Sequence, residues 1–307
     1  MIYDVLIIGS GPSGLTAGIY TSRAALKPLI LAGIKWGGQL MLTSEVENYP
    51  GFPEGIMGPE LMERMKQQAI RFGTDVKEEQ VVSVDFSKRP FTVKTESNEY
   101  QGKSVIIATG ADTVWLGVKG EEKLIGRGIS SCAPCDAFFY RNKNVIVVGG
   151  GDSAMEEALV LTKFASHVTV VHRRGEFRAS KIMQDRVRNH EKIDILWNTT
   201  IEEIIGDHKV EKVKLATDGK IYEKQIDGIF VAVGHVPNSQ IFKGVLGLDE
   251  KGFIKRIPGE IYKTSTDVDG VFVAGDIHDH HYKQAVTAAA YGCESALEVE
   301  KWLEENK

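Results

Sequence analysis

Two glycine-rich turns constrain the fold of this chain more than any other feature of its sequence. The first, GSGPSG at residues 9–14, directly follows the apolar run Val5–Ile8, and the second, GGGDSA at residues 149–154, follows Val145–Val148. Short continuous apolar runs are typical of strands that are buried on both faces of a parallel sheet. A strand, a glycine turn and a helix in this order predict a βαβ unit whose helix N-terminus faces a phosphate group.

The first of these units has three well-placed glycines and one missing element. In order, the glycines permit the tight turn, the approach of the backbone to a pyrophosphate and close packing of the helix. They are Gly9, Gly11 and Gly14. We expect the helix over residues 15–26 and the next strand over residues 28–32. The acidic residue that usually ends this strand and binds a ribose hydroxyl is replaced by Ala32 and Gly33, which weakens the interpretation that NAD is the first ligand.

The second unit ends its second strand with basic residues. Where an acidic residue would hold the free ribose hydroxyl of NAD, the segment HVTVVHRR places His172, Arg173 and Arg174, and Arg178 follows. Arginines at this position suit a 2′-phosphate, which they can bind through bidentate, charge-assisted hydrogen bonds. A solvated basic strand end is the alternative, but the position downstream of the second glycine turn favours a site for NADP.

A pair of cysteines lies between the two glycine turns, in the segment SCAPCDAFFY at residues 131–140. Cys132 and Cys135 have the spacing of a small disulfide whose thiolates can be tuned for exchange. Asp136 is the natural proton donor or acceptor beside them, and a helix N-cap is its alternative role. A zinc site would need Cys293 and the HDHH run at 278–281 as further ligands; because no second C-x-x-C exists, we expect no metal.

Three further segments carry candidate binding residues. GGQL at 37–40 and VENYPGFPEG at 46–55 form a long connection rich in glycine and proline, and its Gln39, Asn48 and Tyr49 favour ligand contact over a plain mobile surface loop. The strand within residues 264–279 ends at Asp276, whose carboxylate suits a polyol or ribityl chain or could cap a helix.

The order of these features predicts an α/β protein with two Rossmann-like three-layer nucleotide-binding domains, the second inserted in the first. We expect the first domain to comprise residues 1–112 and 242–307 and the inserted one residues 113–241, which include the cysteine pair. A length of 307 residues exceeds the usual size of one hydrophobic core and agrees with two domains.

The overall charge and hydropathy exclude several classes of protein. Lysine and arginine together number 37 against 42 aspartates and glutamates, so the net charge of −5 gives no general attraction to nucleic acid or an anionic membrane. No apolar run approaches the roughly 20 residues that span a bilayer. The first residues, MIYDVLIIGSG, run directly into the first strand, so we expect no signal peptide and a cytoplasmic location.

Nearly end to end, the sequence resembles the low-molecular-weight thioredoxin reductases, flavoproteins with two dinucleotide-binding domains. The matching motifs are GSGPSG, GGQL, VENYPGFPEG, ATGA, CAPCD, GGGDSA, HRRGEFR, GHVPN and AGDIHDHHYKQA. The resemblance implies FAD in the first domain, NADPH in the second, oxidised thioredoxin as the partner and a homodimer. It also implies that Cys135 faces the flavin and that Cys132 attacks the partner through a mixed disulfide.

The resemblance also assigns cofactor-binding positions. Those for FAD are Gly9, Gly11, Pro12, Ser13, Gly14, Gly38, Gln39, Leu40, Asn48, Ala108, Thr109, Gly110, Gly275, Asp276, Lys283, Gln284 and Ala285. Those for NADPH are Gly149, Gly151, Asp152, Ser153, Ala154, His172, Arg173, Arg174 and Arg178. The common form of the last motif has arginine where this chain has Lys283, and since lysine is a point charge rather than a planar fork, the contact made there is left open.

The expected activity is transfer of electrons from NADPH through FAD to the Cys132–Cys135 disulfide and on to thioredoxin. A disulfide stacked on the flavin cannot also meet a bulky protein, so we expect the domains to rotate about hinges near Thr113 and Pro237. The alternative is a flavoprotein with the same core that reduces another dithiol protein, such as a peroxiredoxin or a glutaredoxin-like protein, or oxidises a small dithiol.

Overall fold

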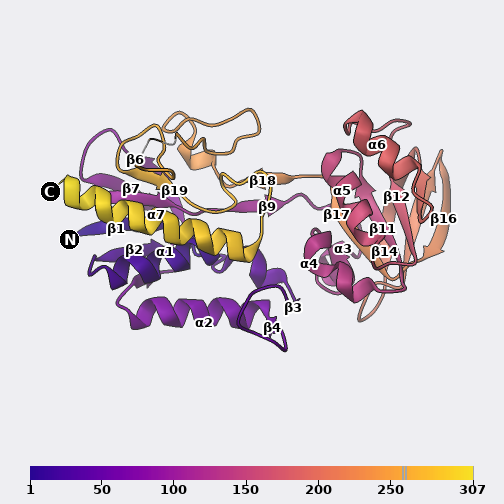
Figure 1. The fold of residues 1–307 in the computed structure, drawn as a ribbon, viewed down its shortest axis with the longest axis horizontal. Helices are drawn as coiled ribbons and strands as arrows, with labels where there is room; N and C mark the ends of the chain where they lie inside the picture. The colour runs from indigo at the N-terminus through magenta and orange to yellow at the C-terminus, as the bar shows by residue number, and fades with distance from the viewer. Residues whose placement is uncertain (258, 260, 307) are drawn as a thin grey trace. The chain divides into compact units, whose positions relative to one another are not determined.

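The computed structural model describes residues 1–257, 259 and 261–306 and divides the chain into two compact units (Figure 1). Unit 1 comprises Met1–Asp112 and Val236–Lys307, and unit 2 comprises Thr113–His235. Each unit is built around its own parallel sheet, so the expected α/β class with one unit inserted in the other is confirmed.

Unit 1 contains a seven-stranded sheet in which most strands run parallel. Its strand order is β5-β2-β1-β8-β7-β6, and β19 also pairs with β8. The parallel strands are β1 (Ile2–Ile8), β2 (Pro28–Leu31), β5 (Asp75–Lys77), β8 (Glu99–Ile107) and β19 (Val271–Val273). The antiparallel strands are β6 (Val81–Asp85) and β7 (Phe91–Thr95), which form the meander that alternating hydrophobicity predicts near residues 81–93.

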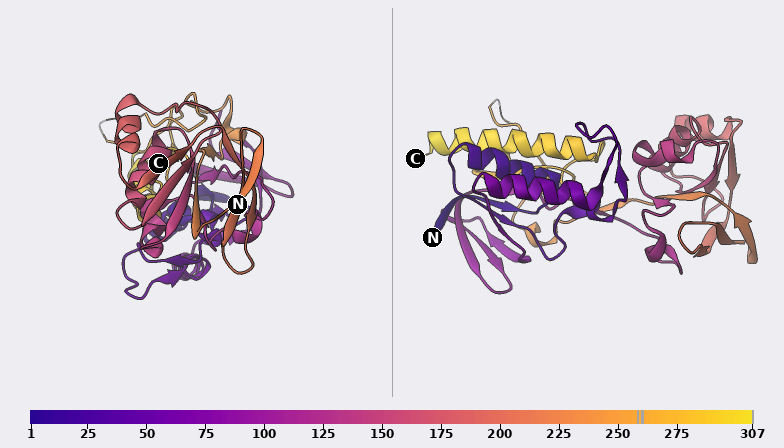
Figure 2. Two further views of the ribbon diagram at one scale, coloured as in Figure 1. Left: turned by 90° about the vertical axis from the view of Figure 1, so that its right-hand side faces the viewer. Right: turned by 90° about the horizontal axis from the view of Figure 1, so that it is seen from below.

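Alternation along β1 separates two hydrophobic cores in unit 1. Val5 and Ile7 face a core shared with three helices, whereas Leu6 and Ile8 face a second core on the opposite side of the sheet. The helices are α1 (Pro12–Arg23), α2 (Gly58–Arg71) and α7 (Ala285–Glu305), and Figure 2 shows them gathered on one side of the sheet. Burial of β1 on both faces explains its continuous apolar sequence.

Short elements complete unit 1. The long connection after β2 contains a 3₁₀ helix and a two-stranded ribbon, and a further 3₁₀ helix follows the second crossing between the units. They are η1 (Gly38–Leu42), β3 (Glu45–Val46), β4 (Ile56–Met57) and η3 (Gln240–Phe242).

Unit 2 is a three-layer arrangement of helices, a parallel sheet and an antiparallel meander. The sheet has the order β10 (Ile129–Ser130), β17 (Gly228–Ala232), β11 (Asn144–Gly149), β12 (His167–Val171) and β13 (Ile193–Leu196). The meander is β14 (Thr199–Ile205), β15 (Lys212–Thr217) and β16 (Lys220–Gln225). The helices are α3 (Glu121–Leu124), α4 (Ala133–Asp136), η2 (Ala137–Tyr140), α5 (Asp152–Leu161) and α6 (Lys181–Arg188).

The chain crosses between the units through two short strands that pair with each other, β9 (Ala111–Thr113) and β18 (His235–Pro237). The second crossing lies at residues 235–236, six residues before the expected boundary at 241–242. Asn238 accounts for the difference, because its backbone N–H donates to Gly110 O at 3.0 Å and its side chain donates to Thr109 O at 3.1 Å. These bonds attach the segment after β18 to unit 1.

The first crossover helix begins earlier than the sequence pattern predicts. It starts at Pro12 rather than at residue 15, and it ends at Arg23. Gly11 is the N-cap in an extended conformation, and Pro12 at the first helical position needs no N–H partner. The glycine turn therefore leads directly into the helix. None of the helices in the described ranges combines the length and the apolar character that a membrane span requires.

Candidate active site

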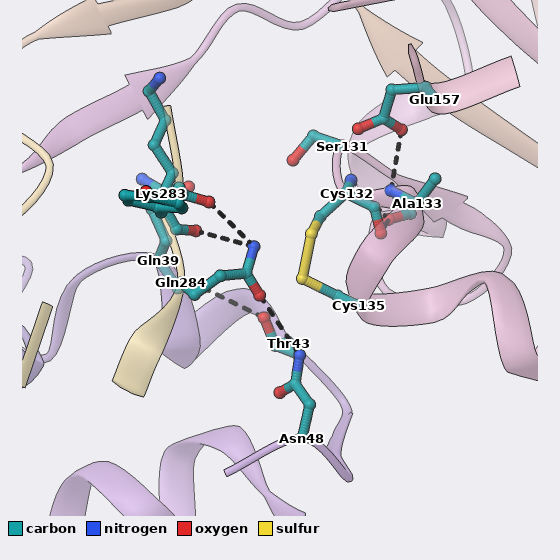
Figure 3. Close-up of a disulfide and its surroundings, with 12 residues drawn as sticks. Gln39, Thr43, Asn48, Ser131, Cys132, Ala133, Cys135, Glu157, Lys283 and Gln284 are labelled. Carbon is teal, nitrogen blue, oxygen red and sulfur yellow. Dashed lines mark hydrogen bonds between the residues drawn. A yellow bond between two sulfur atoms is a disulfide. The ribbon is translucent and has the colours of Figure 1, made fainter. Parts of the chain in front are cut away.

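Cys132 and Cys135 form a disulfide with their Cα atoms 5.3 Å apart (Figure 3). Cys132 is the N-cap of α4, and Pro134 lies in the first turn of that helix, between the two cysteines. The predicted disulfide is therefore confirmed.

Two carboxyl groups lie close to the disulfide turn. Glu157 on α5 accepts a hydrogen bond at 2.8 Å from the backbone N–H of Ala133, the residue after Cys132 (Figure 3). Burial raises the pKa of Glu157 to about 7, with a further contribution from the charge of Asp136. Burial also raises the pKa of Asp136 above its usual value, against a hydrogen bond with Ser130 that lowers it. Both groups can therefore hold a proton more readily than an exposed carboxyl group.

The two alternative roles of Asp136 are that of proton donor or acceptor and that of helix N-cap. The residue precedes the 3₁₀ helix η2, but its side chain makes no capping hydrogen bond there. Ser130, which interacts with Asp136, also accepts a hydrogen bond from the N–H of Cys132 at 3.0 Å. Asp136 therefore does not cap η2 through its side chain, and its proton-transfer role stays a prediction.

Glu157 was not among the residues predicted from the sequence, although its helical spacing indicates that it lies on the buried face of α5. The buried face of α5 carries Ala154, Ala158 and Leu161, and Glu157 falls on that face at the same spacing. A carboxyl group at a buried helical position needs a partner, and here the partner is a backbone amide of the disulfide turn.

The first glycine turn has the geometry of a phosphate-binding turn. A Cβ atom on Gly14 would lie 2.0 Å from Gly9 O, so that position requires glycine for close packing. A Cβ atom on Gly11 would meet no atom within 4 Å, so this side of the turn is open. The N-terminus of α1 has no side-chain cap, which leaves its first backbone N–H groups available to an anion.

Asp276 is the strongest candidate for contact with a hydroxyl-rich ligand. It follows β19, and its Oδ1 atom is buried without a hydrogen-bond partner among the described residues. Burial, reinforced by the nearby charge of Asp279, raises the pKa of Asp276 to about 6. Gly275 has a positive φ of 82°, and a Cβ atom there would lie 2.6 Å from Ser13 Oγ. The fold thus brings the end of β19 against the first glycine turn.

The candidate residues in the loops of unit 1 form two hydrogen-bonded groups. Gln39 donates to Asp112 Oδ1 at 2.9 Å. Asn48 donates to Gln284 Oε1 at 3.4 Å, as Figure 3 shows. Gln284 is also the N-cap of α7, in a capping box with Thr287. The structure therefore places Asn48 and Gln284 side by side although they are 236 positions apart in the sequence.

Lys283 has an environment unlike that of a surface lysine. Its φ angle is +46°, its backbone N–H donates to Asp279 at 3.0 Å, and its ammonium group donates to His280 O at 2.9 Å. Burial lowers the pKa of the ammonium group. This is the position at which the resembling family commonly has arginine, and here the side chain folds back onto its own loop.

The remaining candidate positions of unit 1 lie around the same turn. The segment after β8 approaches it closely, because a Cβ atom on Gly9 would lie 2.2 Å from Ala108 O. A Cβ atom on Gly38 would lie 3.5 Å from the Cα atom of Gly11. Thr109 donates to Asn238 O at 2.9 Å and so fixes the loop that carries Gly110.

The second glycine turn repeats this geometry in unit 2. Gly151 is the N-cap of α5 in an extended conformation, and the helix has no side-chain cap. A Cβ atom on Gly151 would meet no atom within 4 Å. A Cβ atom on Gly149 would lie 2.6 Å from the Cβ of Ala154, which explains the small residue at that position. The exposed Ser153 lies in the first turn of the helix.

The basic residues after β12 divide into two kinds. Arg173, Arg174 and Arg178 are exposed, and within the described part of the chain their guanidinium groups have no hydrogen-bond or ion-pair partner. His172 is only 7% exposed, and its ring packs against Phe177 with 5.3 Å between the ring centroids. Burial lowers the pKa of His172, whose ring packs inside the unit while the three arginines are exposed.

Two units with phosphate-type glycine turns and a C-x-x-C disulfide define a nucleotide-dependent disulfide oxidoreductase. The family model described as pyridine nucleotide-disulphide oxidoreductase matches residues 3–292, and the chain belongs to that family. A thioredoxin reductase of Rickettsia prowazekii is 51% identical over 305 residues, which cover 97% of each chain. Within the family, the chain belongs to the thioredoxin reductases.

Solved structures of thioredoxin reductases show the same fold in two arrangements. The enzyme from Streptococcus pyogenes is 39% identical with a TM-score of 0.94, and 99% of each chain is covered. The enzyme from Lactococcus lactis, in the form called the FR conformation, is 40% identical over the same share of each chain, yet its TM-score is 0.65. Since both are compared with the same chain, these two relatives must differ from each other in overall arrangement.

Proposed function

We propose that this chain is an NADPH-dependent thioredoxin-disulfide reductase that binds FAD in unit 1 and NADPH in unit 2. The observation that carries the proposal is the Cys132–Cys135 disulfide, which lies in the same unit as the second glycine turn of a chain belonging to the thioredoxin reductases. When bound, FAD would accept a hydride from NADPH and supply two electrons for reduction of a disulfide.

The residues of unit 1 fit a flavin dinucleotide. The open side of Gly11 and the uncapped N-terminus of α1 suit its pyrophosphate. The buried, unpartnered Oδ1 of Asp276 suits a hydroxyl donor such as the ribityl chain. The absence of an acidic residue at Ala32 and Gly33 means that the adenosine ribose is held by other groups.

The residues of unit 2 fit a phosphorylated nicotinamide dinucleotide. The N-terminus of α5 at Gly151 has the same open and uncapped geometry as that of α1. Beside it, the three exposed arginines 173, 174 and 178 offer donors for a 2′-phosphate, which NADPH has and NADH lacks. These features support NADPH as the reductant.

The sulfur chemistry follows from the disulfide and its neighbours. Two electrons and two protons convert the Cys132–Cys135 disulfide into two thiols. The Cys132 thiolate then attacks one sulfur of oxidised thioredoxin, and the other thioredoxin sulfur leaves and takes up a proton. Cys135 next attacks Cys132, which restores the disulfide and releases reduced thioredoxin. Asp136, whose pKa is raised by burial, holds and returns the proton that these steps require.

We further propose that the two units rotate relative to each other between the half-reactions. The two crossings, β9 and β18, are short strands at the boundary of the units, and the two solved relatives adopt different arrangements. A cross-link that joins one surface residue of each unit should preserve one half-reaction in rapid-mixing experiments but stop turnover. Full turnover by the cross-linked protein would refute the rotation.

The cytoplasmic location and the homodimer are proposed from the family resemblance. Light scattering coupled to size-exclusion chromatography should give a mass of about twice the 33.8 kDa of one chain. A monomer at micromolar concentration would contradict this part of the proposal.

The proposed activity is tested by mixing the purified yellow protein with NADPH and oxidised thioredoxin. We expect NADPH consumption that requires thioredoxin and is lost in Cys132→Ser and Cys135→Ser. A protein that stays colourless after flavin reconstitution, or that keeps its reducing activity after both substitutions, would overturn the proposal. Turnover with a glutaredoxin-like protein, a peroxiredoxin or a small dithiol, but not with thioredoxin, would instead support the alternative function.

A further inference from the structure

We propose that Asp152 is a positioning residue for the choice between NADPH and NADH. Its carboxylate anchors one end of the arginine loop, defined here as residues 173–180, to the start of α5. The inference rests on the proposed NADPH site, but it assigns Asp152 a different role from the direct nucleotide contact expected from the sequence.

The first anchor joins Asp152 to Ser180. Asp152 Oδ1 accepts hydrogen bonds from the Ser180 backbone N–H at 2.9 Å and from the Ser180 hydroxyl at 2.7 Å. Asp152 is the first residue of α5, and Ser180 immediately precedes α6. These two bonds occupy one carboxylate oxygen and lower the pKa of Asp152, so the side chain stays ionised at neutral pH.

The second anchor joins the same loop to the glycine turn itself. The carbonyl oxygen of Gly150 accepts hydrogen bonds from the N–H groups of Arg178 at 2.7 Å and Ala179 at 3.1 Å. The buried ring of His172 lies directly against Gly150, because a Cβ atom there would be 2.2 Å from Cε1 of the ring. The position of Arg178 is therefore fixed by the turn expected to hold the pyrophosphate.

The opposite end of the loop is attached to the start of the meander. Arg174 O accepts from the Asn198 N–H at 3.3 Å, and the ring of Phe177 packs on Trp197 with centroids 4.3 Å apart. The backbone of the loop is thus held on both sides while its three guanidinium groups stay exposed. Such an arrangement reduces the entropy that would be lost when the arginines bind a phosphate.

This geometry connects Asp152 to selectivity rather than to nucleotide binding in general. The pyrophosphate meets the glycine turn and the N-terminus of α5, and NADPH and NADH share that group. Only the 2′-phosphate needs the arginine loop. Loss of the Asp152 anchor should therefore weaken the binding of NADP⁺ more than that of NAD⁺, so the ratio of the two dissociation constants reports on the anchor.

The test measures the dissociation constants of NADP⁺ and NAD⁺ by calorimetry on the flavin-loaded protein. In Asp152→Ala we expect the preference for NADP⁺ to fall five- to tenfold, which corresponds to the net contribution of one typical hydrogen bond, because the anchor acts on the phosphate only through the arginine loop. Ser180→Ala keeps the backbone donor and should lower the preference about threefold. Asp152→Asn keeps an acceptor oxygen and should restore most of it. The control is Glu156→Ala, an exposed carboxylate on the same helix, which should change the ratio by less than about 1.5-fold.

An unchanged ratio in a folded Asp152→Ala protein would overturn the inference, as would an Asp152→Asn protein that behaves like Asp152→Ala. If Asp152→Ala does not fold, as judged by circular dichroism, Ser180→Ala decides the question. Failure of the underlying NADPH site would look different: the unsubstituted protein would show no preference for NADP⁺, or Arg178→Ala would leave the preference intact.

Discussion

The carboxyl group of Glu157 accepts a hydrogen bond from the backbone amide of Ala133, 2.8 Å away, and thereby joins α5 to the segment between the two disulfide cysteines. The same helix begins at the second glycine turn. One helix thus carries the expected nucleotide contact at its N-terminus and supports the redox turn one and a half turns later, so the two parts of the site in unit 2 share a rigid element.

The environment of Glu157 predicts a pH-dependent cost in stability. Below its usual pKa of 4.5 the carboxyl group is protonated in the folded and the unfolded protein alike, so there is no penalty. Between pH 4.5 and about 7 the unfolded state has lost this proton while the folded state still binds it, so stability falls as the pH rises through this window. Glu157→Gln should therefore unfold with a free energy about 2 to 3 kcal/mol higher than the unsubstituted protein at pH 8, and about equal at pH 4.5. Urea unfolding at both pH values checks this, with a substitution of the exposed Glu156, Glu156→Gln, as control. The prediction is wrong if Glu157→Gln changes the free energy of unfolding by the same amount at both pH values.

We expect the buried carboxylate of Asp276 to lower the stability of the flavin-free protein and to raise its affinity for flavin. Its buried, unpartnered oxygen and raised pKa of about 6 mean that the ionised carboxylate destabilises the flavin-free protein above that pH. Asp276→Asn should raise the melting temperature of the flavin-free protein at pH 8 and weaken flavin binding at least tenfold, because a charge-assisted bond is lost. Thermal unfolding and flavin-release fluorescence measure the two effects. If Asp276→Asn lowered both the melting temperature and the affinity for flavin, this explanation would be wrong.

Because α7 packs closely on the first glycine turn, we expect one added methyl group there to lower the stability of the protein strongly. A Cβ atom on Gly292 would lie 2.1 Å from the backbone oxygen of Ser13, and a backbone atom cannot move aside cheaply. Gly292→Ala should lower stability by about 2 to 4 kcal/mol and weaken flavin retention. Gly18→Ala is the matched control in α1, because its Cβ would meet only side-chain tips, the nearest being Ile30 at 2.8 Å. Equal destabilisation by the two variants in chemical unfolding would refute the backbone clash as the cause.

The burial of Asp136 predicts a selective loss in one half of the reaction. Asp136→Asn cannot exchange a proton, so thioredoxin reduction should fall by about two orders of magnitude, whereas flavin reduction by NADPH should keep its rate. Rapid-mixing absorbance separates the two steps. If both rates fell in parallel, a general structural defect would be the better explanation, and Ser130→Ala, which removes the hydrogen-bond partner of Asp136, would then be expected to have the same effect.

The sequence predicted those parts of the fold that depend on local patterns. The apolar runs at Val5–Ile8 and Val145–Val148 fall within β1 and β11, because strands buried on both faces leave an unmistakable local pattern. The disulfide was predictable for the same reason, since it depends on two residues three positions apart.

What the sequence could not predict depends on contacts between distant segments. The boundary near residue 236 follows from the bonds that Asn238 makes to Thr109 and Gly110, some 130 positions away. The burial of His172 depends on aromatic rings brought in by the loop after β12 and by the turn between β13 and β14. The pairing of Glu157 with Ala133 likewise requires the fold, because no local pattern joins a helix face to a particular backbone amide.

The pairing of β9 with β18 has a consequence for how this architecture can be recombined. Paired strands lie about 5 Å apart, so the inserted unit leaves and rejoins its host through two neighbouring points. A short linker could span that gap and replace the whole segment between Thr113 and His235. The inserted unit could therefore be removed, exchanged or duplicated, in evolution or by design, without changing the strand order of the sheet in unit 1.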